Sequence, residues 1–467
     1  MKGNVEFTRN LWIEARLSRL VALAALLGAL FLFVWLWRDR GGALSGTALT
    51  AYVAIIFIWG NRLAANSVIQ EVNNGTWDSQ RMSAISPWAM TIGKLFGGTI
   101  LVWFGGIICL AVYWWSESKG GYDAELAQTT IIYLGCGLLS HIVSLIVSLV
   151  AIRKRRAHGR LRVWLYQFIG LVAAVPILTL GSNAIETNEL AAYIHGMDLN
   201  WYGVTFPKFG FITMAIAIYA LWGIIGVYRM MRMELLSRNG PLLWLGFVLF
   251  TAIFIAGIEL SGFLERHFAR YPESENFTLR ILTVGALASL LLSYVIVLAE
   301  SKGKTPLIFL KRYAAERRWR EFFDATPRSP ATLILALIMI AAIWAHGQAY
   351  GYHAGHDRIW VAIIIGFLFV ARDIGFIMLM SLWLPSPRAD MTALICLALS
   401  YSLVPALFFA AGVYSARPLF QPVFAGDITS NLGLIAIETG TLYLILAITV
   451  GAVTRTESAE YALAPKP

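Results

Sequence analysis

The chain has 467 residues, of which 58% are hydrophobic and only 14% are charged, and 17 are tryptophans. Soluble globular proteins carry about a quarter charged residues, so this composition excludes a soluble protein and predicts an integral membrane protein. The formal net charge of +10 does not indicate nucleic-acid binding, because the basic residues stand in short segments between apolar runs.

The first nineteen residues, 1–19, are predicted to form an amphipathic helix that lies at the membrane surface. Phe7 and Leu11 recur at helical spacing, with charged residues such as Arg9 and Arg16 set against them. A helix with one apolar and one charged side suits the interface between lipid and water. We therefore expect an interfacial helix that leads into the first membrane span.

A helix that crosses a bilayer needs about 20 mostly apolar residues. On this criterion the sequence predicts about twelve spans, and the second and ninth of them are short. The predicted spans are residues 20–37, 48–61, 90–115, 129–152, 163–180, 211–228, 242–264, 281–298, 331–346, 359–384, 392–414 and 432–450. The expected fold class is thus an all-α polytopic membrane protein.

The charges between spans predict how the chain is oriented. Arginine and lysine gather in the segments 153–162, 229–238 and 300–330, whereas the segments 116–128 and 182–208 are acidic or mixed. Connections rich in basic residues stay on the cytoplasmic side of a membrane. This alternation places both chain termini in the cytoplasm.

The connection between the second and third predicted spans, 71–98, is polar and rich in turn-forming residues. Residues 73–75 read Asn-Asn-Gly and end one helix, and Thr76 is a residue that can cap the next. Ser86 and Pro87 form a second helix-start signal just before an apolar run. Between these two breaks there is room for one short helix.

That short helix is predicted to be amphipathic. Trp77 and Met82 can face the bilayer or the protein core, while Asp78, Gln80 and Arg81 face water. We interpret the segment as a cytoplasmic elbow suited to contact by a partner. The alternative is an ordinary connecting loop with a cap at each end.

The order of these features, a helix end, a glycine turn, a short amphipathic piece and a proline-started helix, resembles the permease subunit of type-2 ATP-binding-cassette (ABC) transporters. The resemblance covers residues 1–115. In that family this segment docks on a separate ATPase subunit. The resemblance therefore implies an ATPase-coupling role for Glu71, Gly75, Thr76, Trp77, Arg81, Met82, Pro87, Gly93 and Lys94.

The resemblance also implies the function. It indicates the permease subunit of an exporter in the bacterial cytoplasmic membrane, which moves a substrate outward with energy from a cytoplasmic ABC ATPase. The permease would not be an enzyme and would bind no cofactor, since the partner binds the ATP. The family's usual permease has about half as many spans, so a homodimer and a pseudo-dimer within one chain both stay open.

A tandem organisation is one interpretation of this length. Residues 51–63 and 359–375 are loosely similar, which favours a degenerate second permease half. The expected segments are the interfacial helix at 1–19, a first half at 20–240, linking helices at 241–304, a second half at 305–453 and a cytoplasmic tail at 454–467.

Four ionisable residues inside predicted spans are candidates for a translocation path. They are Glu259, Arg372, Asp373 and Glu438. Charged side chains at bilayer depth are unfavourable and usually face a partner or a water-filled cavity. Asp373 can neutralise its neighbour Arg372, and Glu259 and Glu438 can serve either a path or a salt bridge between helices.

Other functions find less support in the sequence. Gly303, Lys304 and Thr305 resemble the end of a phosphate-binding loop, but Leu298 stands where that motif needs glycine, so no ATP site is predicted. No metal-ligand spacing and no set of nucleophile, base and oxyanion donors is evident, which leaves a membrane-embedded enzyme as the weakest alternative. A secondary transporter with the same number of spans is the stronger alternative.

Overall fold

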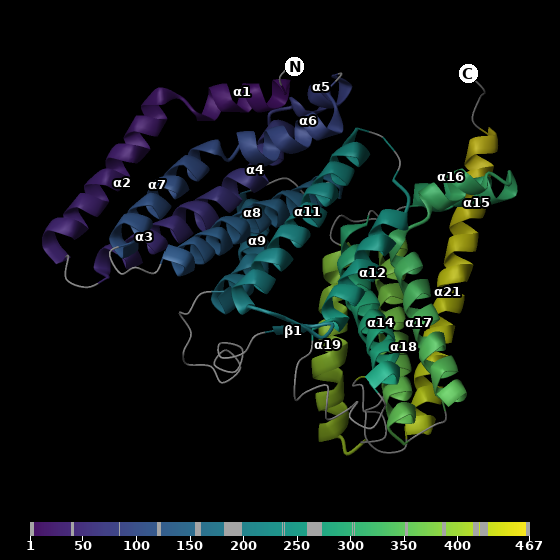
Figure 1. Ribbon diagram of the computed structural model, residues 1–467. Helices are drawn as coiled ribbons and strands as arrows, with labels where there is room; N and C mark the ends of the chain where they lie inside the picture. Colours follow the sequence, from purple (N-terminus) through teal and green to yellow (C-terminus); the bar gives the residue numbers. More distant parts are fainter. Residues whose placement is uncertain are drawn as a thin grey trace. The chain divides into compact units, whose positions relative to one another are not determined.

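The computed structural model describes residues 4–38, 42–83, 85–118, 123–154, 160–181, 199–235, 237, 239–258, 273–300, 302, 304–350, 354–384, 389–413, 420 and 428–463. The chain divides into two compact units. Unit 1 comprises Met1–Leu199 and Val204–Ser237, and unit 2 comprises Asn200–Gly203 and Arg238–Pro467. Each unit is a bundle of helices (Figure 1).

Unit 1 contains several short helices and a set of long apolar helices. Its helices are α1 (Val5–Glu14), α2 (Leu17–Arg38), α3 (Ala43–Val53), η1 (Ala54–Gly60), α4 (Asn61–Asn73), α5 (Trp77–Met82), α6 (Pro87–Ile92), η2 (Gly93–Gly97), α7 (Ile100–Glu117), α8 (Asp123–Arg153), α9 (Arg160–Gly181) and α11 (Lys208–Glu234). A short hairpin, β1 (Leu199–Trp201) and β2 (Val204–Phe206), precedes α11 in the sequence, and its residues Asn200–Gly203 are assigned to unit 2. Helix α8 packs against α4, α9 and α11 and so lies at the centre of the unit.

Unit 2 is a second bundle with one amphipathic segment. Its helices are α12 (Leu242–Ala256), α14 (Glu273–Ala299), α15 (Lys304–Ala315), α16 (Trp319–Ala325), α17 (Arg328–Tyr350), α18 (Ala354–Trp383), α19 (Ala389–Ala410) and α21 (Ile428–Leu463). Helix α14 packs against α12, α17 and α18, and α18 packs against α19 and α21. In Figure 1, α15 and α16 lie across one end of this bundle.

Ten helices in the described residues are long and apolar enough to cross a bilayer. The prediction of an all-α polytopic membrane protein is therefore confirmed at the level of class. Two other predicted spans, 163–180 and 242–264, coincide with shorter apolar helical stretches, Val163–Ala174 and Leu242–Ala256. The predicted total of about twelve spans stays a prediction.

The outer surface of both bundles agrees with this class. Large apolar side chains such as Leu26, Leu291 and Phe409 are exposed on long helices. Extensive exposed apolar surface is rare on soluble monomers, whereas it is the expected lining toward lipid tails. We conclude that the chain is an integral membrane protein.

The helix that contains the second predicted span, 48–61, is longer than that span. The observed helical run is Ala43–Asn73, and it continues through η1 into α4. Polar residues after Gly60 lower the local hydropathy, which is why the sequence pattern ends there. In the structure Asn61 is fully buried and α4 packs on α8 and α9, so neighbouring protein rather than lipid surrounds Asn61, whereas Arg62 is exposed.

Helix η1 is a π-helix in the middle of this run. A change from α to π hydrogen bonding leaves backbone carbonyls in need of partners. His141 Nε2 lies 2.9 Å from the Ile56 carbonyl oxygen, and Gln167 Nε2 donates to the Ile58 carbonyl oxygen at 2.9 Å. Gly60 permits this approach, because a Cβ atom there would overlap the His141 ring.

The N-terminal segment forms a helix as predicted, although its polar side faces inward. Asn4 caps α1 by accepting a hydrogen bond from the Phe7 amide at 3.1 Å. Glu6 is only 1% exposed, whereas Trp12 is 78% exposed. Helix α1 packs on α6, η2 and α7, so its charged residues contact protein and its tryptophan is free to face the membrane surface.

Candidate functional site

The elbow between the second and third spans begins helices at both predicted positions. Helix α4 ends at Asn73, and Gly75 follows with a φ of +70°, a conformation that favours glycine. Ser86 caps α6 through its Oγ, which accepts a hydrogen bond from the Ala89 amide at 3.2 Å, and Pro87 occupies the first helical turn. Turn chemistry thus accounts for the two breaks of the elbow.

Thr76 plays a different part from the one predicted. Its side chain makes no cap on α5, and its hydroxyl instead donates to the carbonyl oxygen of Glu71 at 3.2 Å. The hydroxyl therefore braces the preceding helix end. Helix α5 starts without a side-chain cap and is only six residues long, so packing rather than intrinsic helix stability holds it.

The two faces of α5 differ from the prediction at Gln80. Trp77 is buried, as expected for the apolar side. Gln80 was predicted to face water, but it is buried and its Nε2 donates to Glu71 Oε1 at 2.7 Å. Met82 is 89% exposed and Asp78 is exposed beside it in the same helix, so α5 presents a mixed apolar and charged outer face.

Beneath α5 lies a buried ionic cluster of four residues, Glu6, Arg9, Glu71 and Lys94. Lys94 is 1% exposed and forms ion pairs with Glu6, at 2.8 Å, and with Glu71. Arg9 pairs with the same two carboxylates, at 2.8 Å from Glu6. Two acids and two bases balance in charge, which is the condition under which buried ions are tolerated.

The cluster shifts the pKa of two of its members, Glu6 and Arg9. Burial alone would raise the pKa of Glu6, but Lys94 first and then Arg9 and Asn10 outweigh it and lower that pKa below its usual value. The carboxylates of Glu6 and Glu71 in turn outweigh burial at Arg9 and raise its pKa. Both directions favour the charged forms of Glu6 and Arg9, so their contact is an ion pair.

Gly93 makes this arrangement possible. A Cβ atom at Gly93 would overlap the Glu6 side chain and lie 3.0 Å from its backbone carbon, so α1 could not approach η2. Asn10 Nδ2 donates to the Gly93 carbonyl oxygen at 3.1 Å and strengthens the same contact. The sequence pointed to Gly93 and Lys94, and the structure adds α1 as the element they contact.

The remaining predicted elbow residue, Arg81, contacts the end of α11. Its Nε donates to the Glu234 carbonyl oxygen at 2.7 Å, and its guanidinium lies 3.2 Å from Asp78. Trp88 of α6 stacks on Tyr228 of α11 with ring centroids 4.4 Å apart. The elbow is thereby held by α1, α4 and α11 at once.

A second polar cluster lies among the spans of unit 2. Arg372 donates to Glu438 Oε2 at 3.0 Å and to the Tyr401 hydroxyl at 2.9 Å, and its Nε lies 3.5 Å from Asp373. The hydroxyls of Tyr294 and Tyr401 both donate to Asp373, at 2.6 Å and 2.7 Å from Oδ2. Three of the four residues proposed for a translocation path, Arg372, Asp373 and Glu438, thus come together.

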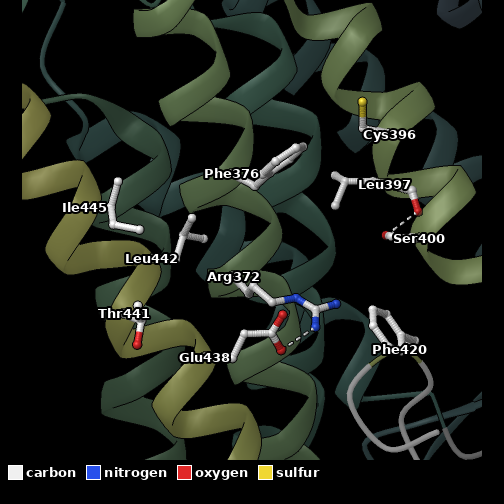
Figure 2. Close-up of a pocket in the computed structure, with 10 residues that line it drawn as sticks. All are labelled: Arg372, Phe376, Cys396, Leu397, Ser400, Phe420, Glu438, Thr441, Leu442 and Ile445. Atoms are coloured by element: carbon white, nitrogen blue, oxygen red, sulfur yellow. Dashed lines mark hydrogen bonds and ion pairs between the residues drawn. The ribbon is translucent and has the colours of Figure 1, made fainter. Parts of the chain in front are cut away.

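This cluster borders a cavity of about 440 Å³. Figure 2 shows Arg372 and Glu438 joined at its edge, with residues of α18, α19 and α21 around it. The lining residues are Arg372, Phe376, Cys396, Leu397, Ser400, Phe420, Glu438, Thr441, Leu442 and Ile445. The volume lies in the range of about 300 to 1,000 Å³ that is typical of small-molecule pockets.

Sequence reasoning missed four members of these two clusters. The sequence pattern places Arg9 on the charged side of the interfacial helix and does not single out Glu6, and Tyr294 and Tyr401 carry no formal charge. A signal was present for the first pair, since Glu6 and Arg9 stand three residues apart on one helix face. The fourth predicted path residue, Glu259, lies outside the described residues.

No protein-family model matches the chain, and the comparisons with curated proteins and with solved structures find no match either. The class of the protein therefore rests on its own helices: it is an all-α polytopic membrane protein.

Proposed function

We propose that the chain is the permease subunit of an ABC exporter in a bacterial cytoplasmic membrane, with ATP bound and hydrolysed by a separate cytoplasmic subunit. The observation that carries this proposal is the short helix α5, which is anchored on its inner side by Trp77 and Gln80 and exposes Met82 and Asp78 outward. A mixed exposed face on a rigidly held helix suits docking to a protein partner.

The anchoring also supplies a route by which a partner's movement reaches the spans. Gln80 on α5 is bonded to Glu71 on α4, and Glu71 is paired with Lys94, which leads into α7. Displacement of α5 would therefore pull on the second and third spans together. A tightly packed, charge-balanced joint transmits such a displacement better than a solvated loop.

The test is to change only the outer face of α5. The double variant Ser79→Arg, Met82→Asp leaves the Arg81–Asp78 pair and the buried residues in place and changes the character of the exposed surface. We expect normal membrane insertion, together with loss of the ABC ATPase from affinity purifications out of the native membrane and loss of export. The expected drop in retained ATPase is roughly tenfold or more, as for removal of an interface anchor.

A matched control uses the other amphipathic segment. In α16, Trp319 and Arg320 are exposed, and the double variant Trp319→Asp, Arg320→Glu introduces similar charge there. ATPase retention should be unaffected. If the α16 variant loses the ATPase and the α5 variant keeps it, the docking site lies at residues 300–330 and the elbow proposal is wrong.

The second candidate function is a secondary transporter, and the polar cluster with its adjoining cavity in unit 2 favours it. Charged residues inside spans are typical of substrate and ion pathways in carriers. A carrier needs no ATPase, so transport by the purified chain in liposomes, driven by an ion gradient alone, would favour this candidate over the permease.

A further inference from the structure

The cavity in unit 2 combines a charged edge with apolar walls. In Figure 2, Arg372 and Glu438 lie together, while Phe376, Leu442 and Ile445 continue the lining along α18 and α21. Apolar walls with a small number of fixed polar groups are the usual composition of a binding site for organic molecules. The sign of the charge at that edge decides which molecules fit.

The hydrogen bonds around Arg372 show which of the two neighbouring carboxylates, Asp373 or Glu438, is free to contact a ligand. The Tyr401 hydroxyl accepts from Arg372 and gives its single proton to Asp373, and Tyr294 gives its proton to the same carboxylate. An ionised carboxylate accepts hydrogen bonds and donates none, and Asp373 accepts from both tyrosines. Asp373 is therefore satisfied by the protein itself and is almost fully buried.

Glu438 is the carboxylate left with unused capacity. Arg372 carries one positive charge against the negative charges of Asp373 and Glu438, so these three residues together are negative. Arg372 contacts only Oε2 of Glu438, and within the described part of the chain Oε1 has no hydrogen-bond partner. The Glu438 side chain is 40% exposed and lines the cavity together with Arg372, so the carboxylate with the unused oxygen borders the space a ligand would occupy.

We propose that this cavity binds amphipathic organic cations, in which a protonated amine or an onium group is joined to an aromatic or alkyl body. The cationic group pairs with Glu438, and the apolar body packs against Phe376, Leu442 and Ile445. Arg372 holds the Glu438 carboxylate in place through Oε2 and leaves Oε1 for the ligand. The claim that the cavity holds a transported substrate rests on the proposed function, whereas the binding of organic cations does not.

The test compares two ions of the same shape and opposite charge. The full chain in lipid nanodiscs is titrated with tetraphenylphosphonium, a cation, and with tetraphenylborate, an anion, and binding to empty nanodiscs is subtracted. We expect saturable binding of the cation only. Glu438→Gln should weaken it by roughly tenfold or more, as for loss of a contact with a charged group, whereas Glu321→Gln on the exposed α16 removes the same charge without effect.

A second variant provides an independent test should Glu438→Gln misfold, since that change removes one of the two acids paired with Arg372. Thr441 is exposed and lines the cavity, so Thr441→Trp fills the space while the ion pair stays intact. It should abolish cation binding, and Leu444→Trp, at an exposed position of α21 outside the lining, should not. Equal binding of the two ions, or unchanged cation binding in Glu438→Gln and Thr441→Trp, overturns the proposal.

These results separate the site from the proposed function. The titration uses no ATPase, so absence of cation binding overturns only the inference about the cavity. Retention of the ATPase by the α5 variant overturns only the permease proposal, because α5 belongs to unit 1 and the cavity to unit 2.

Discussion

Lys94 is almost completely buried and is paired with two carboxylates, Glu6 and Glu71. Its replacement by an apolar residue of similar length, Lys94→Met, would leave these two acids facing one another with only Arg9 to compensate. We expect a loss of roughly 3 to 5 kcal/mol in stability, the usual effect of removing one partner from a buried ion pair. Thermal unfolding of the detergent-purified protein measures it.

The control for this variant is Arg16→Met, which removes one positive charge from an exposed position nearby and should have little effect. The double variant Glu6→Gln, Lys94→Met should recover part of the loss, because it removes one of the opposed acids. If the effects of Glu6→Gln and Lys94→Met simply add, the two residues do not interact and the cluster is not a unit.

The lowered pKa of Glu6 also predicts that the stability of the protein depends on pH. Its pKa is lowered from an ordinary value of 4.5, chiefly because Lys94 and Arg9 outweigh burial. A lowered pKa stabilises the folded state above the unfolded pKa and loses that contribution as the pH falls through the folded pKa. The difference in melting temperature between the native protein and Glu6→Gln should therefore be constant above about pH 4.5 and shrink below it. A difference that vanishes near neutral pH contradicts this explanation.

At the scale of elements, the π-helix η1 depends on side chains from two other helices. Removing the imidazole in His141→Leu leaves the Ile56 carbonyl oxygen without that contact in a buried site. We expect destabilisation of about 1 to 3 kcal/mol, the range for an unpaired buried polar group. Ser148→Ala on the same helix is the matched control, because the Ser148 hydroxyl bonds only to Leu145 of its own helix and should cost less. Equal losses would mean that His141 does not hold η1.

The elbow illustrates how one element acquires its role from others. Helix α5 is too short to be stable alone, and its position follows from contacts with α4 and α11. Helix α1 contributes to the same joint through Glu6 and Asn10. An ATPase that pressed on α5 would therefore act on a preassembled joint and not on a flexible loop.

At the scale of the whole molecule, the alternation of charged connections predicts the topology. The segments 153–162 and 300–330 should be cytoplasmic, and the segments 116–128 and 182–208 should be on the other side. Single cysteines at Ser118 and Arg320, both exposed, are suitable reporters once the native cysteines Cys109, Cys136 and Cys396 have been replaced. In intact cells an impermeant thiol reagent should label position 118 and spare position 320 until the membrane is permeabilised. The reverse pattern would invert the topology.

The division into two units bears on how much of one permease the chain contains. The units meet in sequence at residues 237 and 238, and residues 241–304 lie in the same unit as residues 305–453. The predicted linking helices therefore belong to the second bundle, since α14 packs on both α17 and α18. Whether the two bundles descend from one repeated half stays a prediction from the weak similarity of their sequences.

The sequence by itself determined the membrane class, the long apolar helices and the two breaks of the elbow. These features depend on local properties, namely hydropathy over about twenty residues and the turn chemistry of residues such as Gly75, Ser86 and Pro87. Each can be read from a short window, because the bilayer and the backbone impose the same requirements on every segment.

Only the tertiary structure decided which charges meet. Glu6 and Lys94 are far apart in sequence, as are Arg372 and Glu438, and nothing in a local window pairs them. The same holds for Gln80, whose burial depends on Glu71, and for Asn61, which neighbouring helices keep from lipid. The physical reason is that the favourable burial of a polar group depends on a partner from another element, and packing of the whole bundle selects that partner.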